Sequence, residues 1–86
     1  MEIQIDPHTL ERAKERGANE TEIKDVIGTG TDIPAKYQRK GRYKVYEFKR
    51  ERNHKFYDEK KIEVYYIIEH SKIVTVTVYI FYGRWE

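Results

Sequence analysis

The chain has 86 residues, a net charge of +2 at neutral pH and no cysteine. A chain of this size forms one small domain, so residues 1–86 are expected to fold as a single unit, and the lack of thiols excludes disulfides, cysteine catalysis and thiolate metal ligands. The longest apolar stretch, 73–82, is too short to span a membrane, and no signal peptide is predicted. We therefore expect a cytoplasmic protein.

The charged side chains are unevenly distributed along the chain. Residues 1–33 carry eight acidic and four basic side chains, a net charge of −4, and residues 34–86 carry seven acidic and thirteen basic ones, a net charge of +6. This asymmetry predicts a basic face that meets phosphate groups or an acidic protein. A mixed charged surface selected for solubility or heat resistance explains the composition equally well.

The start of the chain predicts a short strand followed by a helix. In residues 2–5 two isoleucines alternate with polar residues, which favours a short edge strand. Asp6 and Pro7 are typical of a helix start, because Asp caps free amides and Pro fits the first helical position. The helix is expected to run to about Arg16 and to stop at Gly17, since glycine readily adopts the left-handed conformation that ends helices.

A second helix is predicted directly after the first. Asn19 and Glu22 have the spacing of a capping box, and Gly28 is expected to end the helix. Its charged residues are three acids and one lysine, which is the wrong charge for a helix that reads DNA. The run 28–31 is glycine-rich but lacks the Lys-Ser/Thr ending of a phosphate-binding P-loop, so it is interpreted as a linker.

The middle of the chain predicts strands at the edge of a sheet. Residues 32–38 are predicted to form an edge strand past Pro34, and Gly41 is predicted to mark a turn. A further strand is expected over residues 43–50. Residues 51–61 are too charged for a buried strand and are interpreted either as a long hairpin loop or as the frayed ends of two long strands.

The last third of the chain predicts a long antiparallel hairpin over residues 62–82 with a polar turn at 70–72, because both arms are rich in β-branched and aromatic residues. The predicted register gives one core face, made of Ile62, Val64, Tyr66, Ile68, Val74, Val76, Val78 and Ile80. The other face then carries Glu63, Tyr65, Ile67, Glu69, Ile73, Thr75, Thr77, Tyr79 and Phe81. The predicted fold is α+β, with two helices packed on a three- to four-stranded antiparallel sheet.

No metal or cofactor is expected from the sequence. The three histidines lie in different predicted elements and do not have the spacing of metal ligands. The only serine, Ser71, lies in a predicted turn and lacks the motif that surrounds a serine nucleophile.

A basic stretch with interleaved tyrosines is the main candidate for nucleic-acid contact. Cations neutralise phosphates, and tyrosine rings stack on unpaired bases. The predicted RNA-binding residues are Lys36, Tyr37, Arg39, Lys40, Arg42, Tyr43, Lys44, Arg50 and Arg52. An edge strand that lysines protect from aggregation is the alternative interpretation.

Two motifs at the start of the chain carry a family resemblance. The run His8-x-x-x-Arg12-x-x-Glu15-Arg16-Gly17, the following Glu22-Ile23-x-x-Val26-Ile27, the hairpin ending in Val-Thr-Val-Tyr and the closing segment 82–86 fit one pattern. This pattern resembles domain-of-unknown-function family 4258, a family of small prokaryotic proteins. That family is in turn distantly similar to the BrnT and RelE-type toxins of toxin–antitoxin pairs.

The resemblance implies a metal-free endoribonuclease with a RelE- or BrnT-like fold. Such an enzyme cleaves mRNA, free or on the ribosome, and is neutralised by an antitoxin protein. It needs a base, an acid and a cation around the scissile phosphate. The residues that would supply them are His8, Arg12, Arg16, Tyr79, Tyr82 and Arg84.

A non-catalytic module that binds protein or RNA is the alternative function. The outer face of the predicted sheet is rich in tyrosine and threonine, and an interacting chain could dock there or add a strand. The sequence leaves open whether a second copy of the chain covers this face as a homodimer.

Overall fold

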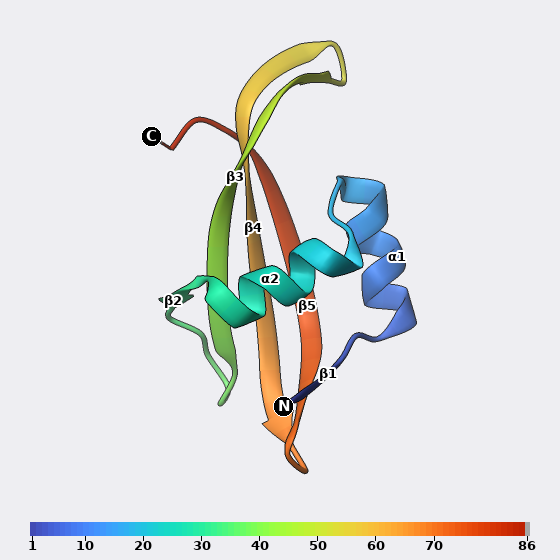
Figure 1. The fold of residues 1–86 in the computed structure, drawn as a ribbon, viewed down its shortest axis with the longest axis vertical. Helices are drawn as coiled ribbons and strands as arrows, with labels where there is room; N and C mark the ends of the chain where they lie inside the picture. The colour runs from blue at the N-terminus through green and yellow to red at the C-terminus, as the bar shows by residue number, and fades with distance from the viewer. Residues whose placement is uncertain (86) are drawn as a thin grey trace.

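The computed structural model describes residues 1–85, and Glu86, the last residue of the closing segment, lies outside the described residues. Its elements are β1 (Glu2–Gln4), α1 (Pro7–Arg16), α2 (Glu20–Thr29), β2 (Thr31–Ile33), β3 (Lys40–Arg52), β4 (Lys55–Glu69) and β5 (Lys72–Gly83). The strands form one sheet in the order β1-β5-β4-β3-β2, and both helices pack on the same side of it (Figure 1). The predicted α+β class is confirmed. The predicted sheet is wrong in two details, because five strands form it and β1 pairs with β5 in parallel.

The helix starts follow the local signals in the sequence. The Asp6 carboxylate accepts hydrogen bonds from the backbone N–H groups of His8 and Thr9, both at 3.1 Å. At α2, Asn19 and Glu22 make both bonds of the predicted capping box, at 2.8 and 3.1 Å. Both predicted N-termini are therefore confirmed.

The helix ends agree with the prediction at α1 and differ slightly at α2. Gly17 ends α1 with a φ of 103°, in the left-handed region. α2 continues past Gly28 to Thr29, and the N–H of Gly30 then bonds to the Val26 carbonyl at 2.8 Å. Neither helix within residues 1–85 is long and apolar enough to cross a membrane.

The core lies between the helices and the middle of the sheet. The buried apolar residues are Ala13, Ala18, Ile23, Val26 and Ile27 on the helical side and Ile62, Val64, Tyr66 and Val78 on the strands. Short helices such as these are held mainly by such packing, because isolated helices shorter than about 12 residues are marginal in water.

The predicted loop at 51–61 consists of the ends of two long strands. β3 runs to Arg52 and β4 begins at Lys55, which bears out the second of the two interpretations. Asn53 and His54 both have positive φ, as the two-residue type I′ hairpin turn requires. The tip of the hairpin extends beyond the helices (Figure 1), and the residues at the turn, 53–56, are exposed.

The predicted strand at 32–38 and the predicted turn at Gly41 are wrong. β2 is only three residues long, and the chain leaves the sheet at Pro34, which has no N–H to donate to a ladder. Gly41 lies inside β3, opposite Tyr65 on β4 and Ile33 on β2. A Cβ at this position would lie 2.9 Å from both neighbouring side chains, so the glycine allows close packing within the sheet.

A bulge in β5 overturns part of the predicted register. Val64 lies opposite Val78 as predicted, but Tyr66 pairs with Thr75, so Val76 is an additional residue in β5. The bulge reverses the alternation of side chains before it. As a result Ile73 and Thr75 face the core, whereas Val74 pairs with Ile67 on the outer side.

The bulge leaves one hydroxyl group without a partner. Thr75 is 4% exposed, and its Oγ1 makes no hydrogen bond within residues 1–85. Replacing Thr75 by valine is expected to raise the free energy of unfolding by about 1 kcal/mol, because the desolvation cost of the hydroxyl is removed while the shape is kept. Urea unfolding measures the change, and Thr77→Val, a substitution on the outer face, serves as the control. A loss of stability in Thr75→Val would contradict the prediction.

Three side chains from the sheet hold the end of α1, and we call them the α1 clamp. Arg52 of β3 donates to the Glu15 carbonyl at 2.9 Å, Lys60 of β4 to the Gly17 carbonyl at 2.8 Å, and Tyr82 of β5 to the Arg16 carbonyl at 2.6 Å. The carbonyls at a helix end have no partner within the helix and carry its negative dipole charge. Two cations and a hydroxyl therefore satisfy three successive carbonyls.

Candidate nucleic-acid interface

The three predicted site residues on α1 line one groove against the sheet. His8, Arg12 and Arg16 are spaced four residues apart, so they form a row along one side of the helix. With Thr9 and residues 76–78 of β5 they enclose a cavity of about 130 Å³. This volume is well below the roughly 300 Å³ of the smallest drug-sized pockets, so it suits a phosphate-sized group.

The cations of this groove are not neutralised by the protein itself. Within residues 1–85, the guanidinium groups of Arg12 and Arg16 take part in no hydrogen bond or ion pair. Glu11 and Glu15 occupy a neighbouring stripe of α1 and do not line the groove. Unpaired guanidinium groups favour phosphate, which they bind through two parallel hydrogen bonds.

The strand edge beside the groove is also unpaired. β1 pairs only with residues 72–74 of β5, and no other strand within residues 1–85 continues along that edge. Backbone N–H and C=O groups of β5 therefore face the groove next to Arg12 and Arg16. The groove combines cationic side chains with backbone donors.

Tyr82 lies on the same side of the sheet as the groove but does not line it. Its hydroxyl is committed to the Arg16 carbonyl, and its ring packs on Phe48 and Tyr57 and beneath the Arg52 guanidinium. Burial raises the pKa of Tyr82, so the hydroxyl remains protonated at neutral pH and cannot act as a base. Tyr82 thus has a structural role in the α1 clamp.

Tyr79 and Arg84, the other two predicted catalytic residues, lie away from the groove. The Tyr79 ring contacts Tyr65 and Phe81 on the outer face of the sheet. Arg84 lines a separate recess of about 540 Å³ together with acidic side chains of β3 and β4, including Glu47. The structure therefore brings together three of the six predicted catalytic residues and separates the rest.

The basic stretch is divided between the two faces of the sheet, because successive residues of a strand point in opposite directions. On the helix side, Arg42 donates to the Asp32 carboxylate and the Ile27 carbonyl, and Lys44 pairs with Asp25 at 2.7 Å. These two cations hold α2 and β2 on the sheet. On the outer face, the Lys61 ammonium lies 4.7 Å from the centroid of the Tyr43 ring.

The remaining predicted RNA-binding residues lie in four places. Arg52 belongs to the α1 clamp, and Arg50 lies over the Phe48 ring on the protruding hairpin. Lys40 points to the helix side at the start of β3. Lys36, Tyr37 and Arg39 come from the loop between β2 and β3 and line a cavity of about 180 Å³ on the outer face.

Asp25 makes the stability of this helix–sheet contact sensitive to acid. Hydrogen bonds from Lys44 and Tyr46 lower the pKa of Asp25 from 3.8 to about 2. Because the folded pKa lies below the unfolded one, the stabilisation is complete above pH 3.8 and is lost as the pH falls to about 2. Melting temperatures between pH 2 and 7 are expected to fall more steeply for the wild type than for Asp25→Asn, with the two curves converging at the acid end. Parallel curves would contradict the assignment.

The outer face of the sheet carries an aromatic surface that the sequence predicted only in part. It comprises Tyr37, Tyr65, Tyr79 and Phe81, with Lys36 and Arg39 beside it. Tyr37 is 83% exposed, and both Tyr37 and Gln38 have positive φ, which is unfavourable for residues other than glycine and asparagine. The alternation along the hairpin indicated the strand tyrosines, but only the fold brings the loop at 34–39 beside them.

Comparison with known proteins identifies no significant match to this chain, either to a family model or among curated proteins and solved structures. The family resemblance stays a prediction, and the functional argument rests on the geometry of the two surfaces. Within residues 1–85, no three His, Asp or Glu side chains are grouped as a metal site.

Proposed function

We propose that this protein is a metal-free endoribonuclease, similar in outline to the RelE and BrnT-type toxins, with the scissile phosphate bound in the groove between α1 and β5. The observation that carries the proposal is the row of His8, Arg12 and Arg16 along that groove, with both guanidinium groups unpaired. A protein that only needed a charged helix surface would be expected to pair these cations with the neighbouring glutamates.

The proposed reaction uses the ribose 2′-hydroxyl group as the nucleophile. The 2′ oxygen attacks the adjacent phosphorus, the bond from phosphorus to the 5′ oxygen breaks, and a cyclic phosphate remains on the 3′ side. The His8 imidazole accepts the proton of the 2′-hydroxyl, and water protonates the departing 5′ oxygen. Arg12 and Arg16 hold the phosphate oxygens and stabilise the negative charge that develops in the transition state.

The direct test is cleavage of single-stranded RNA by the purified protein in EDTA. Wild type is expected to give products with 2′,3′-cyclic phosphate ends, and Arg12→Ala/Arg16→Ala is expected to reduce the rate by at least about 100-fold, as loss of transition-state donors does elsewhere. Lys14→Ala removes a cation from another side of the same helix and is the matched control. Equal activity of the double variant and the wild type would place the site elsewhere.

Expression in a bacterial host tests the toxin-like part of the proposal. Growth arrest with loss of mRNA is expected for the wild type and not for Arg12→Ala/Arg16→Ala. Cleavage in the cell but not of free RNA would indicate that mRNA is cut on the ribosome. The proposal also implies an antitoxin, so co-expression of a small reading frame adjacent to this gene is expected to restore growth.

A non-catalytic RNA-binding module is the second candidate, and the aromatic surface favours it. Exposed rings flanked by Lys36 and Arg39 are suited to stacking on unpaired bases. Under this alternative, Tyr37→Ala and Tyr79→Ala reduce RNA affinity while Arg12→Ala/Arg16→Ala does not, and the wild type cleaves nothing. If a second copy of the chain covers the surface instead, sedimentation shows a dimer that Tyr79→Ala weakens.

A further inference from the structure

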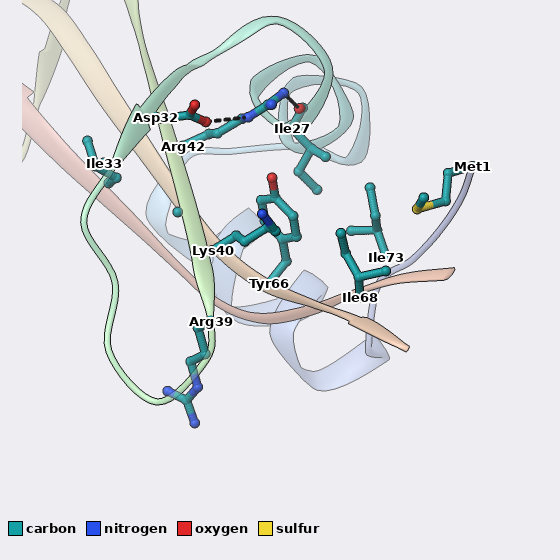
Figure 2. A pocket seen from close by; sticks show the side chains of 11 residues that line it. Met1, Ile27, Asp32, Ile33, Arg39, Lys40, Arg42, Tyr66, Ile68 and Ile73 are labelled. Carbon is teal, nitrogen blue, oxygen red and sulfur yellow. Dashed lines mark hydrogen bonds and ion pairs between the residues drawn. The ribbon is translucent and has the colours of Figure 1, made fainter. Parts of the chain in front are cut away.

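A larger cavity lies on the helix side of the sheet, beyond the C-terminal end of α2 (Figure 2). Its volume is about 440 Å³, within the range of small-molecule sites of about 300–1,000 Å³. Apolar side chains line much of it, namely Ile27 of α2, Ile68 of β4 and Ile73 of β5. The cavity forms because α2 crosses the middle of the sheet and leaves this end of the strands uncovered (Figure 1).

The hydroxyl group of a largely buried tyrosine lies at this cavity. Tyr66 is 4% exposed, and its hydroxyl makes no hydrogen bond to any residue within 1–85. Figure 2 shows the ring of Tyr66 directed toward α2, with its hydroxyl close to Ile27. Solvent reaches this hydroxyl, since Thr75 Oγ1 is the one buried side-chain atom without a partner within residues 1–85, so the hydroxyl is able to bond to a bound molecule.

Positively charged side chains outnumber negatively charged ones around the cavity. Lys40 lies directly opposite Tyr66 in the β3–β4 ladder, and its ammonium group pairs with no carboxylate within residues 1–85. Arg42 also lines the cavity and is held in place by Asp32 and the Ile27 carbonyl, which fixes its guanidinium before any ligand arrives. With Arg39, three cationic side chains line the cavity against a single carboxylate, which is on Asp32.

We propose that this cavity binds a small organic anion that has one carboxylate or phosphate group and a flat or branched apolar body. The anionic group binds to Lys40 and the Tyr66 hydroxyl, and the apolar body lies against Ile27, Ile68 and Ile73. The site shares no residue with the α1–β5 groove, so it does not depend on the proposed ribonuclease activity.

Titration of the full chain with indole-3-acetate and with phenyl phosphate, followed by ¹H–¹⁵N NMR spectra, tests the proposal. At least one of the two anions is expected to shift the amide signals of Gly41, Tyr66 and Ile73 in a saturable way. Lys40→Met is expected to weaken binding about tenfold and Tyr66→Phe about fivefold, in line with loss of a charged and a neutral hydrogen bond. Indole-3-acetamide is the neutral analogue. Its affinity for the wild type is expected to be no higher than the affinity of indole-3-acetate for Lys40→Met.

The matched control is Lys36→Met, which removes a lysine close in sequence but outside this cavity and is expected to bind like wild type. Melting temperatures of the three variants near that of the wild type show that the fold is retained. The proposal is overturned if neither anion shifts these signals up to its solubility limit. It is also overturned if Lys40→Met binds as tightly as Lys36→Met.

Discussion

Replacing Lys60 by methionine is expected to lower the free energy of unfolding by about 3–5 kcal/mol, the cost of breaking a buried ion pair. Lys60 is only 8% exposed, and its ammonium group lies 2.8 Å from both the Glu22 carboxylate and the Gly17 carbonyl. Methionine keeps the length and most of the packing but leaves the half-buried Glu22 carboxylate and the Gly17 carbonyl without their cation. Chemical unfolding followed by circular dichroism measures the loss.

Two further variants separate the effect of charge from that of packing. Lys61→Met changes the next residue, which faces the outer side of β4 and pairs with Glu63 at 3.3 Å, and is expected to cost less than Lys60→Met because this contact is longer and its lysine is more exposed. Lys60→Met/Glu22→Gln removes both charges and is expected to recover part of the stability lost in Lys60→Met. If Lys60→Met and Lys61→Met lose equal stability, the buried ion pair does not hold α1 and α2 on the sheet.

Gly28→Ala and Gly30→Ala are expected to change the free energy of unfolding in opposite directions. A Cβ at Gly30 would lie 2.4 Å from the Val26 carbonyl oxygen and 2.8 Å from the Tyr43 carbonyl oxygen, both of them backbone atoms. Because backbone cannot move aside as a side chain does, Gly30→Ala is expected to lower the free energy of unfolding by about 2–3 kcal/mol. A Cβ at Gly28, inside α2, would meet nothing within 4 Å apart from its neighbours and the backbone of its own helix, so Gly28→Ala is expected to raise the free energy of unfolding by about 0.5–1 kcal/mol.

Thermal and urea unfolding of the two single variants provide the comparison, with each variant serving as the control for the other. A gain of stability in both variants would mean that the junction between α2 and β2 relaxes to admit a methyl group at Gly30, and a loss in both would contradict the prediction for Gly28. The sequence alone does not distinguish these glycines, since both belong to the run 28–31 that reads simply as a linker.

The parts of the fold that depend on neighbouring residues were predictable from the sequence. Asp6, Asn19 and Gly17 act within one helical turn, and each does what its local pattern predicts. The bulge at Val76 and the position of Gly41 inside β3 were not predictable. Both depend on which side chains lie across from them on other strands, information that no local window contains.

The same distinction applies to the candidate sites. His8, Arg12 and Arg16 share a groove because helical spacing alone places them on one side of α1. The sequence predicted a single basic surface along β3. Successive residues of a strand point to opposite faces, so Arg42 and Tyr43 lie on different sides of the sheet. The cavity beside Tyr66 required both the register and the path of α2, so the sequence contained no signal for it.

The α1 clamp also has a consequence for the order of folding. Arg52, Lys60 and Tyr82 follow their partners on α1 by 37, 43 and 66 residues. Contacts between residues so far apart in the chain form late and slow the search for the native state. The first helix to be synthesised therefore obtains its final hydrogen bonds only when the last strand is in place, and its amide protons are expected to exchange with solvent together with those of β5.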